Sequence, residues 1–322
     1  MGAISAKSPK GNEMRISSLL LAGGLVAAGL GGAYAAEDIF DLSPEQPGRI
    51  HVVADPALAA KLPAAFTWAV PGSFTVAVAA AGEPPLGTYA TDAATVVGAD
   101  PDIASLVAEK LGLQLNLVPV AWADWPLGLT SGKYDAVISN VGVTEERKLK
   151  FDFSTYRQGL HGFFVVTDSP IKSLKEPKDV AGLKIATSSG TIQDRIINEW
   201  SKENVAAGLA ASDILYYEDT PAALLAIQSG RVDAIFNVNS VFTYQALKTG
   251  AIHQVGTVNA GWPNTTEVGI TTRRDSGLAP VLTEALNAVI ADGSYARTLE
   301  RWHLTPEAVK TARTNPPGLP KY

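Results

Sequence analysis

The chain has 322 residues, of which 46% are hydrophobic and 18% charged, a composition typical of a globular protein long enough for two domains. It contains no cysteine, which excludes disulfides, a thiol nucleophile, a cysteine-based zinc site and a lipid-modified cysteine. The four histidines lie far apart, and the net charge of −6 comes without a dense basic tract. We therefore expect no metal site, no cofactor and no nucleic-acid partner.

Residues 1–35 have the pattern of a secretory signal. Met14-Arg15 precedes an apolar run at 16–30, and Ala33-Tyr34-Ala35 matches a small-residue cleavage site. The run is short and glycine-rich for a spanning helix. We expect cleavage near Ala35, with residues 1–13 as an upstream extension, and a product that is free and soluble outside the cytoplasm. A retained membrane anchor is the alternative interpretation.

Residues 36–71 are rich in proline and alanine and indicate a preamble, not a domain. Within it, Asp55 followed by Pro56 predicts an N-cap and a short helix that ends at about Leu62.

Beyond the preamble, strands and helices alternate. The predicted strands are 74–80, 113–120, 137–141, 161–167, 183–187, 213–217, 232–237 and 268–272. The predicted helices are 100–112, 127–131, 192–201, 220–229, 240–249, 278–291 and 294–301. The fold class is therefore α/β with two parallel-type sheets. Ligands bind such sheets at the carboxyl ends of the strands, and two lobes face to face make a cleft.

The stretch 133–153 (KYDAVISNVGVTEERKLKFDF) is a candidate anion site. A buried strand runs into a polar edge at Ser139-Asn140 and then into a charged turn that carries Arg147. A guanidinium fork together with backbone N–H donors is a common way to hold a small carboxylate. An ordinary strand-to-helix turn with a surface arginine is the alternative.

Two internal segments repeat one pattern. Residues 129–138 (LTSGKYDAVI) and 227–236 (IQSGRVDAIF) each contain a helix end, a glycine stop, a basic residue and an Asp-Ala that opens a buried strand. This repetition indicates two similarly built lobes.

Several short motifs together resemble one known family. They are Gly132-Lys133-Tyr134-Asp135, Thr144-Glu145-Glu146-Arg147, Asp152-Phe153-Ser154, Ser189-Gly190-Thr191, the run 229–234 and the run 291–296. This set resembles the periplasmic solute-binding proteins of amino-acid ABC importers, over roughly residues 72–305. The resemblance implies a type II periplasmic binding protein that closes around a small-molecule solute and docks onto a membrane permease without chemistry. It also leads us to expect a monomer.

The resemblance implies two Rossmann-like lobes joined by a two-strand hinge. Lobe 1 would comprise 72–166 plus 268–310, and lobe 2 would comprise 168–264. The crossing strands would lie near 166–168 and 263–267, and 311–322 would be a C-terminal tail.

The resemblance also assigns ligand contacts. Arg147 corresponds to the arginine that clamps the ligand carboxylate, and Ser189, Thr191 and the N–H of Ile192 correspond to the other side of that clamp. A helix N-terminus suits an anion because its free N–H groups point outward. Trp122 corresponds to an aromatic wall. Plain core packing for Trp122, and simple helix capping for Ser189 and Thr191, are the alternatives.

One departure from the family pattern concerns the ligand ammonium. The position of the usual aspartate falls on Val238, between the uncharged Asn237 and Asn239. Removing one partner from a buried ion pair costs roughly 3–5 kcal/mol, or two to four decades of affinity. Glu83 is our hypothesis for a replacement anion, with a solvated loop glutamate as the alternative. Without it, the ligand would lack an ammonium there, as in a carboxylate, an amide-like compound or a modified amino acid.

Other departures lie in lobe 1. Leu86 stands where the family places an aromatic residue, and Asn140 and Gly142 replace a commoner glycine and a serine or threonine. Two further functions stay open: a dehydratase-like enzyme of this fold that uses Glu83 as acid or base, and a periplasmic partner protein that has lost its ligand.

Overall fold

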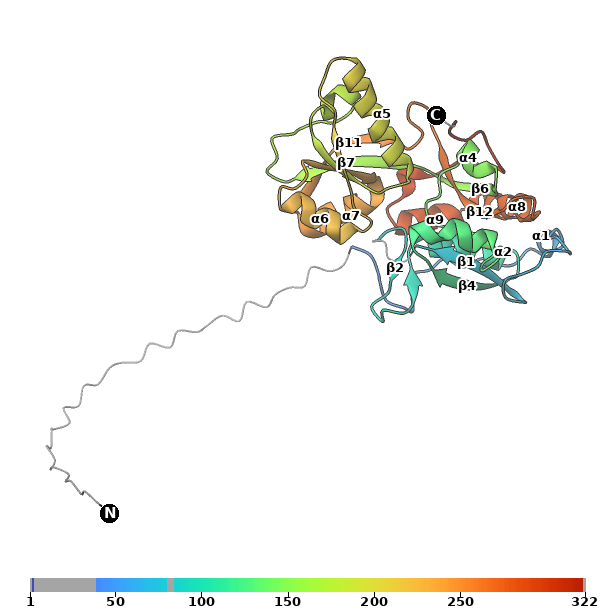
Figure 1. The fold of residues 1–322 in the computed structure, drawn as a ribbon. Helices are drawn as coiled ribbons and strands as arrows, with labels where there is room; N and C mark the ends of the chain where they lie inside the picture. Colours follow the sequence, from blue (N-terminus) through green and yellow to red (C-terminus); the bar gives the residue numbers. More distant parts are fainter. Residues whose placement is uncertain (1, 3–38, 80–83, 321–322) are drawn as a thin grey trace. The chain divides into compact units, whose positions relative to one another are not determined.

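The computed structural model describes residue 2 and residues 39–79 and 84–320, and Figure 1 shows the course of the chain. Apart from residue 2, these residues fall in one compact unit, residues 38–322. The expected signal sequence and Glu83 lie outside the described residues. Within the described part of the chain, no helix is both long enough and apolar enough to cross a bilayer.

The first sheet has the strand order β4-β1-β5-β12-β6. Its strands are β1 (Ser73–Val78), β4 (Gln114–Pro119), β5 (Ala136–Val137), β6 (Phe151–Gln158) and β12 (Glu267–Arg273). β1 is parallel to β4 and β5, whereas β12 is antiparallel to β5 and β6. One face is covered by α2 (Ala99–Lys110), α8 (Leu278–Ala291) and α9 (Ser294–Arg301), and the other by α3 (Trp125–Thr130).

The second sheet has the strand order β11-β7-β10-β8-β9. Its strands are β7 (Leu160–Val166), β8 (Lys184–Thr187), β9 (Asp213–Tyr216), β10 (Ala234–Val238) and β11 (Ile252–Asn259). Helix α5 (Ile192–Ala206) packs against Phe163 and Phe236 on one face. Helices α6 (Thr220–Gln228) and α7 (Asn239–Thr249) pack against Phe164 and Ile235 on the other. We call each sheet with its covering helices a lobe.

Short elements complete the described chain: α1 (Pro56–Ala59), β2 (Thr88–Tyr89), β3 (Val96–Val97), α4 (Glu145–Lys148) and 3-10 turns at Trp122–Asp124, Pro177–Val180 and Thr305–Glu307. The predicted cap of α1 is confirmed, because the Asp55 carboxylate accepts hydrogen bonds from the N–H groups of Ala57 and Leu58. Phe40 and Leu58 are buried in the core of the first lobe, so the preamble packs onto that lobe.

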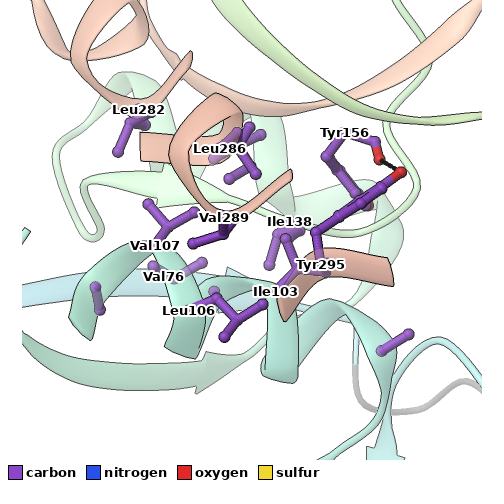
Figure 2. Close-up of a cluster of buried hydrophobic side chains, with 14 of the residues drawn as sticks. Val76, Ile103, Leu106, Val107, Ile138, Tyr156, Leu282, Leu286, Val289 and Tyr295 are labelled. Atoms are coloured by element: carbon purple, nitrogen blue, oxygen red, sulfur yellow. Dashed lines mark hydrogen bonds between the residues drawn. The ribbon is translucent and has the colours of Figure 1, made fainter. Parts of the chain in front are cut away.

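The core of the first lobe forms where α2 and α8 meet over the sheet. Ile103, Leu106 and Val107 follow helical spacing and are fully buried. Figure 2 shows them close to side chains of α8, and the Tyr295 hydroxyl donates a hydrogen bond to the backbone oxygen of Tyr156 at 2.7 Å. Burial of each large aliphatic side chain contributes about 1.5–3 kcal/mol. This core gives the loops at the strand ends a rigid base.

The first crossing between lobes lies at Gly159, not at 166–168. β6 belongs to the first sheet, whereas β7 pairs with β10 and β11 in the second, so the predicted extension of lobe 1 to residue 166 was wrong. Gly159 separates the two strands, and a Cβ there would lie 2.7 Å from the Ala260 methyl group. The second crossing runs from the end of β11 to the start of β12 at Glu267.

Candidate functional site

A cavity of about 180 Å³ is lined by residues of both lobes. Its walls include the loops that follow β5 and β8, the end of β10 and the start of α5, so it lies at carboxyl ends of strands. The predicted site residues that line it are Leu86, Trp122, Asn140, Gly142, Arg147, Thr191, Ile192 and Asn237.

The structure fixes the guanidinium of Arg147 in the cavity wall. Thr144 caps α4 by accepting a hydrogen bond from the Arg147 N–H at 3.0 Å. Arg147 Nη1 donates to the Gly142 oxygen at 2.9 Å, and the guanidinium carbon lies 5.5 and 5.9 Å from the ring centroids of Trp122 and Trp125. These contacts hold the cation in one place and make Trp122 a wall of the site.

The charge of Arg147 has no counterion among the described residues. Among residues 39–79 and 84–320, its guanidinium donates a hydrogen bond to the neutral Gly142 carbonyl and forms no ion pair. Burial lowers the pKa of Arg147 to about 10, and the positive charge of Arg195 acts in the same direction. The guanidinium therefore stays protonated at neutral pH and is complementary to an anion.

The second lobe brings the start of α5 to the same cavity. Thr191 is the N-cap: its hydroxyl accepts from the Asp194 N–H at 3.2 Å and donates to the Ser188 oxygen at 2.6 Å. Ile192 packs closely on the first lobe, since a Cβ on Gly142 would lie 2.3 Å from its Cδ1. Glycine at 142 therefore permits close contact of the lobes. Ser189 does not line this cavity. It lines an adjoining groove, which Arg147 also lines.

Neutral polar groups line the wall near the end of β10. Gln193 Nε2 donates to Asn237 Oδ1 at 2.9 Å, and Asn237 Nδ2 donates to Ser188 Oγ at 3.1 Å. Val238 also lines the cavity and supplies no charge. Asn239 lies apart from this wall; it borders a smaller cavity, and its side-chain oxygen accepts a hydrogen bond from Gln254.

The backbone conformation and a side-chain hydrogen bond explain why asparagine is favoured at position 140. Its φ of 54° lies in the left-handed region, where asparagine is tolerated better than most residues. Its side-chain oxygen accepts a hydrogen bond from Arg157 Nη2 at 2.5 Å, and Arg157 also pairs with Glu307 in the interior. This network holds the loop after β5, which carries the cavity wall. Leu86, which replaces an aromatic residue, is buried and faces the cavity.

Several cavity residues were not predicted, and three of them are titratable: Asp100, His161 and the exposed Glu218. Asp100 is buried, and its carboxylate accepts a hydrogen bond from the Tyr156 hydroxyl at 2.8 Å. Burial raises the pKa of Asp100, and the nearby charge of Arg157 opposes that shift. His161 is 3% exposed, and burial lowers its pKa to about 3. In the sequence Asp100 and His161 only open a helix and a strand, and nothing there indicates that they face one cavity.

The chain is similar in sequence to a family of known proteins. The family model for bacterial extracellular solute-binding proteins, family 3, matches residues 75–305. The L-cystine-binding protein TcyJ of Escherichia coli (strain K12) is 26% identical over 231 residues, which cover 71% of this chain and 82% of that protein. ABC transporter arginine-binding protein 1 of the same strain is 26% identical over 210 residues, covering 64% and 82%.

Solved structures are similar over the same region. An ancestral arginine-binding protein bound to arginine has 28% identity and a TM-score of 0.62, covering 72% of this chain and 98% of that one. An ancestral amino acid-binding protein, a precursor of cyclohexadienyl dehydratase, has 26% identity and a TM-score of 0.60, covering 72% and 95%.

Proposed function

Since this chain belongs to family 3 of the bacterial extracellular solute-binding proteins, we propose that its cavity binds a small carboxylate-bearing solute and that the protein delivers this solute to the permease of an ABC importer. The relatives are named for binding arginine and cystine, which supports an amino acid or an amino-acid derivative as the solute.

The unpaired charge of Arg147 is the observation that carries this proposal. A partly buried cation without a counterion is unfavourable, and a bidentate carboxylate supplies both the charge and two hydrogen bonds. The cavity of about 180 Å³ has room for on the order of ten water molecules, hence for a solute of about ten non-hydrogen atoms. Both features support a solute of amino-acid size.

We propose binding without catalysis. A general base that works near neutral pH needs a pKa near that pH. The pKa of His161 is about 3, and Asp100 is engaged by the Tyr156 hydroxyl. These properties disfavour an acid–base role for either residue. A periplasmic location and a monomeric state are further parts of the proposal, and the unpaired Arg147 disfavours a partner protein that has lost its ligand.

A thermal-shift screen tests the proposal. The full-length chain would be screened against amino acids, opines, betaines and dicarboxylates. A ligand at a hundredfold excess over its dissociation constant stabilises the protein by about 2.7 kcal/mol, a rise of several degrees. We expect at least one carboxylate to give this rise, and Arg147→Ala to abolish it.

The matched control is Arg231→Ala, which removes an exposed arginine outside the cavity and should leave the shift unchanged. A carboxylate that binds Arg147→Ala as tightly as the native chain would contradict the proposed site.

A further inference from the structure

His161 lies beside the position that lacks the expected carboxylate. It is on β7, the strand between β10 and β11, and its register partners are Val238 and Val258. Directly opposed residues of antiparallel strands point to the same face of a sheet. His161 and Val238 therefore form one patch of the cavity wall, and both line the cavity.

The imidazole of His161 is buried without hydrogen-bond partners. Neither ring nitrogen makes a hydrogen bond to any residue of the described chain, although the residue is only 3% exposed. Its ring contacts the edge of Phe236, with centroids 5.7 Å apart. Because most buried polar atoms in proteins have a partner, an unpaired imidazole in a cavity wall points to a ligand group that supplies one.

The charge state of this patch indicates what that group is. With its pKa at about 3, His161 is neutral at physiological pH and offers one N–H donor and one acceptor nitrogen. An ammonium held against a neutral imidazole and Val238 would be a buried charge without a counterion, which is strongly unfavourable.

Two carboxylates line the cavity. Asp100 is buried, already accepts a hydrogen bond from Tyr156 and lies near the charge of Arg157. Glu218 is exposed and also lines the groove beside Arg147.

We infer that His161 is a second ligand-binding residue, an inference that rests on the proposed carboxylate site at Arg147. His161 selects carboxylates whose second polar group is a neutral hydroxyl or an acylated nitrogen, and it disfavours carboxylates that carry a free ammonium. The apolar part of such a solute would contact Leu86, Val241 and Val268, which line the same cavity.

Calorimetry with matched probes tests this inference on the full-length chain. The probes are L-leucine, its 2-hydroxy analogue, N-acetyl-L-leucine and 4-methylpentanoate, which share one carbon skeleton and differ in the substituent beside the carboxylate. We expect the hydroxy acid or the acetylated compound to bind at least about tenfold more tightly than leucine. His161→Phe should weaken that binding by about 10- to 100-fold and leave 4-methylpentanoate within about twofold.

Two further variants separate a binding role from a structural one. His161→Gln keeps a donor and an acceptor and should restore part of the preference. Thr298→Val removes another buried, unpartnered oxygen, one outside the cavity, and should change no affinity. His161→Phe should also raise the melting temperature of the ligand-free protein, which shows that the variant folds.

Leucine binding as tight as that of its neutral analogues, or an unchanged preference in His161→Phe, would overturn the inference and leave the role of Arg147 intact. Carboxylate binding that is indifferent to Arg147→Ala would instead overturn the proposed function.

Discussion

Two side chains of the cavity, the partly buried Arg147 and the buried His161, keep different charges at neutral pH. Arg147 keeps its charge because even a pKa of about 10 lies well above neutral pH, whereas His161 loses its charge because its pKa falls to about 3. The cavity therefore offers a cation from one lobe and, at His161, a neutral donor and acceptor from the other, which also places the exposed Glu218 in the cavity wall. This combination suits a carboxylate that bears a neutral polar group.

The titration of His161 makes a prediction about stability. Between pH 6.5 and about 3 the unfolded chain binds a proton at this residue that the native chain does not. The contribution of His161 to stability is therefore fully present above pH 6.5, and it falls by about 1.4 kcal/mol per pH unit as the pH decreases through this window. Urea unfolding at pH 7, 5.5 and 4.5 should show that the free energy of unfolding of His161→Phe rises relative to that of the native chain each time the pH is lowered. A pH-independent difference would contradict the assignment.

The sequence predicts part of the site at residue level. Arg147 and Thr191 belong to local motifs, Trp122 was assigned through the family resemblance, and all three line the cavity. His161 could not be found in this way, because its role depends on a register that pairs it with Val238, 77 positions away in the chain. Glu83 lies outside the described residues, so its proposed role remains a hypothesis.

At the scale of elements, the C-terminal tail connects the lobes beside the Arg147 turn. The Leu319 N–H donates to the Val143 oxygen at 3.0 Å, and its own oxygen accepts from the Glu145 N–H at 2.8 Å. The Leu319 side chain is 2% exposed and belongs to the cluster that contains Ile192 and Ile196 of the second lobe. The segment predicted as a tail is therefore packed between elements of both lobes.

Leu319→Ala should lower the free energy of unfolding by about 2–5 kcal/mol, because it removes a buried side chain and leaves a cavity. Leu149→Ala is the matched control, since Leu149 is 67% exposed, and it should change stability by less than about 0.5 kcal/mol. Equal effects of the two substitutions in urea unfolding would contradict the packing of the tail.

Most strands and helices follow from local patterns, but the long strands β6 and β11 and the two-residue strands β2 and β3 were not predicted. Strand β6 contains Asp152 and Arg157, which look unsuited to a buried strand. Arg157 is tolerated in the interior because Glu307, 150 residues later, pairs with it. Partners so distant in sequence are outside the reach of local patterns, and the same limitation led to the misplaced first crossing.

At the scale of the whole molecule, the alternation of strands and helices, the repeated segment and the family motifs were sufficient to predict an α/β fold with two sheets. The position of each crossing depends instead on which sheet a strand joins. The cavity lies at strand ends of both lobes, with Gly142 and Ile192 in close contact at its edge. A solute bound as proposed would therefore contact both lobes.

The most direct test of the proposed function is calorimetric comparison of the tightest-binding carboxylate with its methyl ester. Esterification removes the anion and leaves the rest of the solute intact. We predict that the ester binds at least about a hundredfold more weakly to the native chain, because the partly buried Arg147 would again lack a counterion. An ester that binds as tightly as the acid would contradict the central role of Arg147 and with it the proposed class of ligand.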